Sequence, residues 1–152
     1  MYKDGPVIVT FYRGGWCPFC NTALKGWETR QADVKAAGAT FVAISPEKPE
    51  NVAKTATQDG ATFPMMSDAK LEAAKGFNVA FMLDEKTQTA YKGYGVDLAS
   101  SNAAKTWELP MPATFVVDKE GIIRYAFAEM DYKRRADPDQ VLGAVKALNA
   151  KK

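Results

Sequence analysis

Residues 7–21 read VIVTFYRGGWCPFCN, an apolar run that leads directly into two cysteines three positions apart. The first six residues, Val7–Tyr12, are β-branched or aromatic, which is typical of a central strand covered on both faces. Two glycines interrupt the run, and Pro18 favours the first turn of a helix, where its missing N–H costs nothing. The stretch therefore predicts a strand, a turn that carries both cysteines, and a helix.

Cys17 and Cys20 are expected at the N-terminus of this helix, where unpaired N–H groups and the helix dipole stabilise a thiolate. The pKa of a free cysteine thiol is ~8.5, and motifs of this kind lower it to ~7 or below. One sulfur can then attack a substrate to form a sulfenic acid or a mixed disulfide. The other sulfur, within one helical turn, converts this intermediate into a disulfide between the two cysteines. Arg13 lies close in sequence and is expected to add positive potential. The pair is predicted to be the redox centre of a thiol oxidoreductase.

Composition excludes several other kinds of protein. The 152 residues are 47% hydrophobic and 25% charged, which suits a single domain spanning 1–152 with its own core. Two cysteines cannot form a disulfide framework, and the absence of histidine excludes Ser-His-Asp triads, Cys-His proteases and histidine-ligated zinc. We therefore expect neither a metal nor a cofactor. The net charge of +2 is too small to indicate nucleic-acid binding.

The remaining pattern alternates between strands and helices. Strands are predicted at 40–44, 63–66, 113–117 and 122–130, and helices at 18–37, 49–59, 69–76 and from 138 onward. Residues 77–101 are predicted to be irregular. Alternation followed by a hairpin and a terminal helix predicts an α/β sandwich, with a mixed central sheet flanked by helices. No apolar run approaches the ~20 residues of a membrane span, and residues 1–6 lack a signal-peptide layout, so a cytoplasmic location is expected.

Four segments resemble the peroxiredoxin-like branch of the alkyl hydroperoxide reductase/thiol-specific antioxidant superfamily: residues 11–21, 42–47, 109–118 and 131–135. The resemblance covers nearly the whole chain. It implies a thioredoxin-like fold and the reduction of hydrogen peroxide or organic hydroperoxides by cysteine. It also implies a thioredoxin- or glutathione-type reductant and a homodimer, with residues 77–101 as the segment in which to look for its contacts. The family's N-terminal hairpin is missing, so we expect either a truncated chain or a minimal version of the fold.

The family motif Pro-x-x-x-Thr-x-x-Cys aligns its peroxide-attacking cysteine with Cys20. Cys17 then occupies the threonine position and Arg13 the proline position, so two parts of the peroxide-binding loop differ. The resemblance implies that Cys20 attacks and Cys17 resolves. The analogy with thioredoxin implies the reverse, because the first cysteine is the nucleophile there.

Three further residues are candidates for the site. Pro112 stands where peroxiredoxins carry an arginine and resembles the cis-proline of thioredoxins, so we predict a cis Met111–Pro112 bond that faces the cysteines. The family's arginine is expected at Arg135, or Arg13 takes its place. Trp16 is expected either to shield the cysteines or to be plain core.

These residues support three functions. The first is a thiol peroxidase whose cysteine pair cycles between dithiol and disulfide. The second is a thiol-disulfide reductase acting on protein or small disulfides, indicated by Cys-x-x-Cys and Pro112. The third is a redox-inactive binding module on the same fold, against which the intact pair beside Arg13 argues. None involves a nucleic acid or a membrane.

Overall fold

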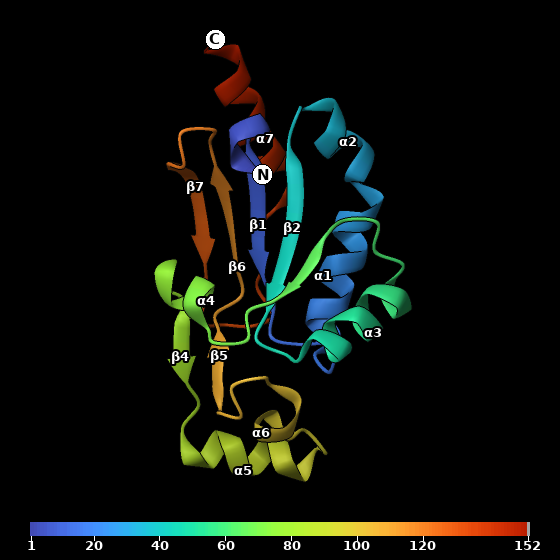
Figure 1. Cartoon of the computed structure of the whole chain (residues 1–152), viewed down its shortest axis with the longest axis vertical. Coiled ribbons are helices and arrows are strands. Elements are labelled where there is room, and N and C mark those ends of the chain that lie inside the picture. The colour runs from blue at the N-terminus through green and yellow to red at the C-terminus, as the bar shows by residue number, and fades with distance from the viewer. Residues whose placement is uncertain (152) are drawn as a thin grey trace.

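The computed structural model describes residues 1–151, and its centre is a mixed five-stranded sheet (Figure 1). The strand order is β3-β2-β1-β6-β7. The strands are β1 Val7–Phe11, β2 Thr40–Ser45, β3 Met65–Ser67, β6 Ala113–Val117 and β7 Ile123–Ala128. β1 lies at the centre, parallel to β2 and antiparallel to β6. The predicted mixed sheet is therefore confirmed.

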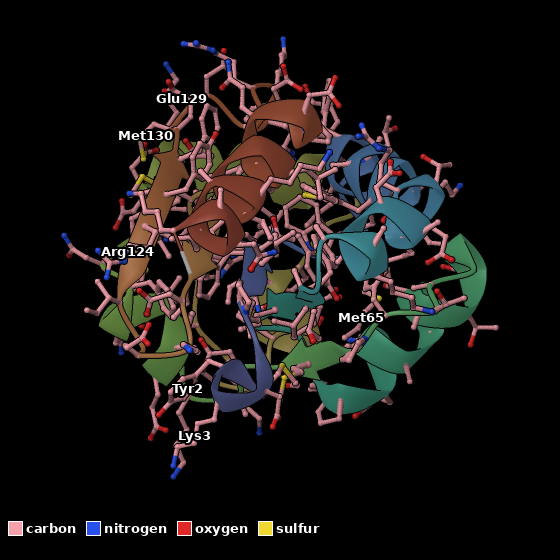
Figure 2. All side chains as sticks on the ribbon, turned by 90° about the horizontal axis from the view of Figure 1, so that it is seen from above. Tyr2, Lys3, Met65, Arg124, Glu129 and Met130 are labelled. Carbon is pink, nitrogen blue, oxygen red and sulfur yellow. The ribbon has the colours of Figure 1, made fainter. Side chains whose placement is uncertain are left out.

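Helices cover both faces of this sheet, and each face has its own hydrophobic core. Successive side chains of β1 point to opposite faces and so enter the two cores in turn. Ile8 enters one core, and Val7, Val9 and Phe11 enter the other. The first core packs beneath α1 (Pro18–Thr29), α2 (Gln31–Ala36) and α7 (Pro138–Ala150), which lie on the same side in Figure 2. The second packs beneath α4 (Glu72–Gly76), and α3 (Pro49–Asp59) flanks β3 and α1. The predicted α/β sandwich is confirmed.

Residues 77–101 form regular structure, so the prediction of an irregular segment is wrong. They contain β4 (Ala80–Met82), α5 (Glu85–Gly93) and α6 (Leu98–Ser101), and β4 pairs with β5 (Glu108–Pro110). Asp84 and Asp97 cap the two helices by accepting backbone N–H bonds. This extension lies below the main sheet in Figure 1, at the end where α1 begins.

The helix predicted over 18–37 is divided at Arg30, which separates α1 from α2. The Arg30 N–H turns back to the Trp27 carbonyl, while its guanidinium bonds Asp33 at 2.7 Å and Asp139 at 2.8 Å. These bonds hold the turn at a point where the apolar pattern continues without a break. Several other predicted boundaries differ by up to three residues.

The peptide bond between Met111 and Pro112 is trans, and residues 1–151 contain no cis peptide bond, so the cis prediction is wrong. The Met111 N–H donates to the Val79 carbonyl at 2.8 Å, and the Pro112 carbonyl accepts the Glu129 N–H at 3.2 Å. Both bonds are made along the path from β5 into β6. Nothing in these contacts opposes the ordinary preference of about 0.5–1 kcal/mol for trans.

Candidate active site

The two cysteines occupy the first turn of α1. Cys17 is the N-cap, in extended backbone geometry, and its sulfur accepts the Cys20 N–H at 3.4 Å. Pro18 follows at the first helical position, as the sequence predicts. Both thiols are free and only 1% exposed, and their sulfur atoms lie 2.8 Å apart. A disulfide requires about 2.05 Å, so only a small movement separates the dithiol from the disulfide.

The loop before Cys17 depends on two glycines. Gly14 has a φ of +157°, and a side chain there would collide with Trp16 and Glu47. A side chain on Gly15 would overlap the Thr55 hydroxyl. The Gly15 N–H donates to Glu47 Oε2 at 3.1 Å, and burial raises the pKa of this carboxyl. The loop is thus held between Thr55 on α3 and Glu47, which follows β2, and this fixes the start of α1.

Two arginines bring positive charge to the sulfur atoms. Arg135 Nη2 lies 3.2 Å from Cys20 Sγ, although the two residues are 115 positions apart in the chain. The backbone N–H of Arg13 donates to the same sulfur at 3.4 Å. The Arg13 guanidinium faces the sulfur of the other cysteine, with Nη1 3.9 Å from Cys17 Sγ. The resemblance left Arg13 and Arg135 as alternatives, and the structure brings both to the pair.

The pair is arranged to hold one negative charge. The hydrogen bond from the Cys20 thiol, together with the charges of Arg13 and Arg135, lowers the pKa of Cys17 to about 6, although burial opposes this. Burial raises the pKa of Cys20, as does its hydrogen bond with Cys17. Since the sulfurs share one proton across 2.8 Å, the ionisations belong to the pair. A larger fraction of the pair is therefore ionised at neutral pH than of a free thiol.

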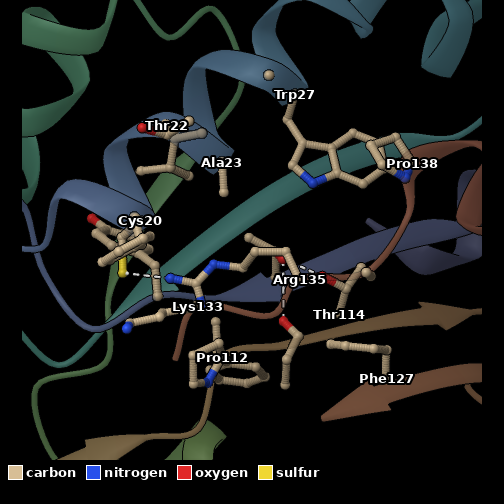
Figure 3. Close-up of a pocket in the computed structure, with 18 residues that line it drawn as sticks. Cys20, Thr22, Ala23, Trp27, Pro112, Thr114, Phe127, Lys133, Arg135 and Pro138 are labelled. Atoms are coloured by element: carbon tan, nitrogen blue, oxygen red, sulfur yellow. Dashed lines mark hydrogen bonds between the residues drawn. The ribbon is translucent and has the colours of Figure 1, made fainter. Parts of the chain in front are cut away.

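A cavity of about 250 Å³ borders Cys20 and is mostly apolar (Figure 3). Arg135 reaches across it to the Cys20 sulfur, and Pro112 and Lys133 line it too. Its apolar lining comes mainly from α1, β1 and β6, and includes Phe19, Ala23, Leu24, Trp27, Ala113 and Phe127. Cys17 is not among the lining residues. The cavity therefore borders one cysteine of the pair.

The other predicted residues have definite places. Trp16 is half-buried and packs edge-on against Tyr91, with ring centroids 5.7 Å apart, and it also packs against the core that contains both cysteines. Tyr91 was not predicted, because nothing in the sequence links a tyrosine on α5 to Arg13, 78 positions away.

This arrangement suits the reduction of a bond between two electronegative atoms. A thiolate attacks one atom of that bond and becomes joined to it. The neighbouring thiol then attacks the same sulfur, which releases the attached group and leaves a disulfide between the two cysteines. Among residues 1–151 no three potential metal ligands come together. No helix in that range is long and apolar enough to cross a membrane.

Comparison with protein families matches residues 1–126 to the AhpC/TSA family. The chain belongs to the AhpC/TSA family. A putative peroxiredoxin of Mycobacterium tuberculosis is 32% identical over 122 residues, which cover 80% of this chain and 67% of that protein. Peroxiredoxin Bcp of Escherichia coli is 26% identical over 145 residues, covering 95% of this chain and 81% of Bcp.

Solved structures share the fold. Peroxidoxin BcpB from Mycobacterium tuberculosis superposes with a TM-score of 0.72 at 22% identity, covering 97% of this chain and 82% of BcpB. The bacterioferritin comigratory protein of Xanthomonas campestris, studied for its alkyl peroxide reduction activity, has a TM-score of 0.72 at 20% identity. That match covers 95% of this chain and 80% of the other. AhpC/TSA membership and the adjacent cysteines confirm the predictions of a peroxiredoxin-like chain and a thiol peroxidase.

Proposed function

We propose that Cys20 attacks the peroxide and that Cys17 resolves the product. The observation that carries this assignment is the cavity, which borders Cys20 and not Cys17. Arg135 supports it, because its guanidinium donates to Cys20 Sγ from the wall of the same cavity. A hydroperoxide in this cavity meets the Cys20 sulfur and a fixed positive charge together.

The chemistry proceeds in two balanced steps. The Cys20 thiolate attacks one peroxide oxygen and the O–O bond breaks, which leaves a sulfenic acid on Cys20. The leaving oxygen takes up a proton and departs as an alcohol, or as water from hydrogen peroxide. The Cys17 sulfur then displaces hydroxide from the sulfenic acid; with the Cys17 proton this leaves as water, and the disulfide remains. Two electrons pass from the dithiol to the peroxide.

The proton between the sulfurs reconciles this assignment with the lowered pKa of Cys17. A shift of that proton across 2.8 Å places the charge on Cys20 and makes Cys17 the donor. Cys20 Sγ then accepts from Arg135 Nη2 and the Arg13 N–H. These two donors stabilise the attacking thiolate as the substrate arrives.

A thiol-disulfide reductase is the second candidate, because the lowered pKa of Cys17 favours the first cysteine as nucleophile, as in thioredoxin. The 1% exposure of Cys17 opposes it, since a protein disulfide must reach the attacking sulfur. Turnover of insulin disulfides faster than by a free dithiol, together with an ordinary thiol rate toward peroxide, would replace the first proposal with the second.

Stopped-flow oxidation of the reduced protein tests the peroxidase proposal. We expect a rate with hydrogen or organic peroxide far above that of free cysteine, and one disulfide formed per peroxide consumed. Since the thiolate is the reactive form, the rate should fall as the pH decreases through about 6 and level off above it. A rate no faster than free thiol at pH 7 would end the proposal.

The apolar cavity favours organic hydroperoxides with an apolar body. Ala23 lines it, so Ala23→Leu should narrow it and lower kcat/KM for an aromatic hydroperoxide about tenfold. The reaction with hydrogen peroxide should change less than about twofold, because this substrate needs little of the volume. Ala53→Leu, on the exposed side of α3, is the matched control. Equal losses with both peroxides would show that the cavity does not select the substrate.

The proposal also covers regeneration and assembly. A thioredoxin- or glutathione-type reductant returns the disulfide to the dithiol. This reaction requires a reducing compartment, and we propose the cytoplasm. The chain works as one domain over 1–152 and forms a homodimer. Side chains exposed on residues 77–101, such as Met82 and Tyr94, are available for its contacts. Sedimentation and coupled turnover assays with each reductant test these points.

A further inference from the structure

Within residues 1–151, Arg13 is a buried cation without a carboxylate partner. Its side chain belongs to a residue that is only 4% exposed, and none of the salt bridges within residues 1–151 involves it. Burial of an isolated charge is costly unless other groups replace its hydration. The groups that do so here therefore determine where this guanidinium points.

Three aromatic rings and two polar atoms surround it. The ring centroids of Trp16, Tyr91 and Tyr132 lie 4.9, 5.3 and 4.6 Å from Arg13 Cζ, within the range of cation–π attraction. Nη2 donates to the Tyr91 hydroxyl, and Nη1 faces Cys17 Sγ at 3.9 Å. We call Trp16, Tyr91 and Tyr132 the Arg13 cage. Of the two polar contacts, only the cysteine sulfur can readily carry the opposing charge near neutral pH.

Tyr91 has a special place in this cage, because it is supplied by the extension and not by the main sheet. It lies on α5 and packs on a small core formed by Leu83, Leu98, Trp107 and Leu109. Trp16, the neighbour of Cys17, packs on the same core. The extension is thereby joined to the cysteine loop through two rings and one hydrogen bond.

The structure assigns Tyr91 as a positioning residue for the proposed peroxidase reaction, on which this inference rests: it holds the Arg13 guanidinium against Cys17. By accepting the Nη2 hydrogen, its hydroxyl fixes the plane of the guanidinium and leaves Nη1 directed at the sulfur. Among the hydrogen bonds within residues 1–151, none joins Tyr91 to either cysteine. Its effect passes through Arg13, whose charge favours the thiolate.

Other charged groups near these sites are few. Around Cys17 they are Cys20, Arg13 and Arg135. Around Arg13 the titratable groups are Tyr91, whose hydroxyl accepts its hydrogen bond, and Tyr132, whose ring lies against it. Lys133 Nζ lies 6.0 Å from the centroid of the Tyr132 ring, and Asp84 lines the same pocket as Arg13 while it caps α5 by accepting the Thr87 N–H. Within residues 1–151 the guanidinium donates to the Tyr91 hydroxyl and to the Cys17 sulfur, so removal of the hydroxyl is the change that leaves the cysteines intact.

Ultraviolet titration of the thiolate in Tyr91→Phe tests the assignment. Phenylalanine keeps the ring and removes the acceptor, so we expect the pKa of the pair to rise by about half to one unit. Tyr94→Phe is the matched control, since Tyr94 ends the same helix at 84% exposure, and its titration should match the unaltered protein. Tyr91→Gln restores an oxygen acceptor and should recover part of the shift.

The peroxide rate supplies a second readout. For Tyr91→Phe it should fall about threefold to tenfold at a pH below the pKa of the pair, and less than about twofold at pH ~8, where the thiolate is complete. A loss that is equal at all pH values would show a merely structural role. An identical titration for Tyr91→Phe and Tyr94→Phe would overturn the assignment. If Tyr91→Phe does not fold, Tyr91→Leu carries the same expectation.

The two proposals fail in different ways. An ordinary thiol rate toward peroxide in the unaltered protein would contradict the peroxidase proposal, whereas the thiolate titration would still decide whether Tyr91 positions Arg13.

Discussion

Cys20→Ser is expected to abolish peroxide consumption, with a loss on the order of a thousandfold or more. A serine hydroxyl does not ionise near neutral pH, so the atom that borders the cavity no longer attacks. The remaining Cys17 keeps the nearby Arg13 guanidinium but lies outside the cavity lining. Stopped-flow kinetics with an organic hydroperoxide measure the loss.

Cys17→Ser is the matched comparison. This variant retains the Cys20 sulfur, Arg135 and the cavity, so one equivalent of peroxide should still be consumed rapidly. Turnover should then stop, because no neighbouring thiol forms the disulfide. If Cys17→Ser does not consume the first equivalent of peroxide and Cys20→Ser does, the assigned roles of the two cysteines are reversed.

Arg135→Gln has the second-largest expected effect. Arg135 Nη2 donates to Cys20 Sγ and presents its charge to the cavity, where a peroxide oxygen develops negative charge as the O–O bond breaks. Removal of such a donor at a reacting centre typically costs 10²–10³ in rate, and we expect a decrease of about that size in kcat/KM. Glutamine keeps the approximate length and polarity while it removes the cation.

Arg134→Gln is the control for this change. Arg134 is adjacent in sequence, but its side chain is 66% exposed and pairs with Glu129 at 3.2 Å. Its loss should leave the peroxide rate within about twofold, because exposed ion pairs contribute little. Equal rates for the two variants would mean that Arg135 has no part in the reaction.

Local patterns explain why much of the fold was predicted correctly. The apolar run of β1 predicts a central strand, and Pro18 after the cysteine predicts the N-terminus of a helix. Both features are present, with Cys17 as the N-cap. The hairpin at Asp118–Gly121 also follows from local chemistry, since Gly121 adopts a φ of +82°. In each case a few neighbouring residues determine the conformation.

The failed predictions depend on partners far along the chain. β4 has three residues and exists because β5 pairs with it across more than twenty positions, so its own sequence gives little signal. The cis prediction failed for another reason, since it came from the resemblance to thioredoxins and the Met111–Pro112 bond has the ordinary trans geometry. The division of the first helix at Arg30 involves Asp139 from the other end of the chain.

The site divides in the same way. Cys17, Cys20 and Arg13 lie within eight positions, and the motif was enough to predict them together. Arg135 was a candidate through resemblance alone, and its contact with Cys20 depends on the loop before α7. Tyr91 lies on a helix that the sequence pattern does not predict, so its contact with Arg13 appears only in the folded chain.

The most direct test of the central claim is to locate the sulfenic acid. Cys17→Ser is treated with one equivalent of hydroperoxide in the presence of dimedone, which traps sulfenic acid, and the labelled peptide is identified by mass spectrometry. The proposed chemistry predicts rapid and stoichiometric labelling of Cys20 in this variant. No labelling of Cys20, with efficient labelling of Cys17 in Cys20→Ser, would contradict it.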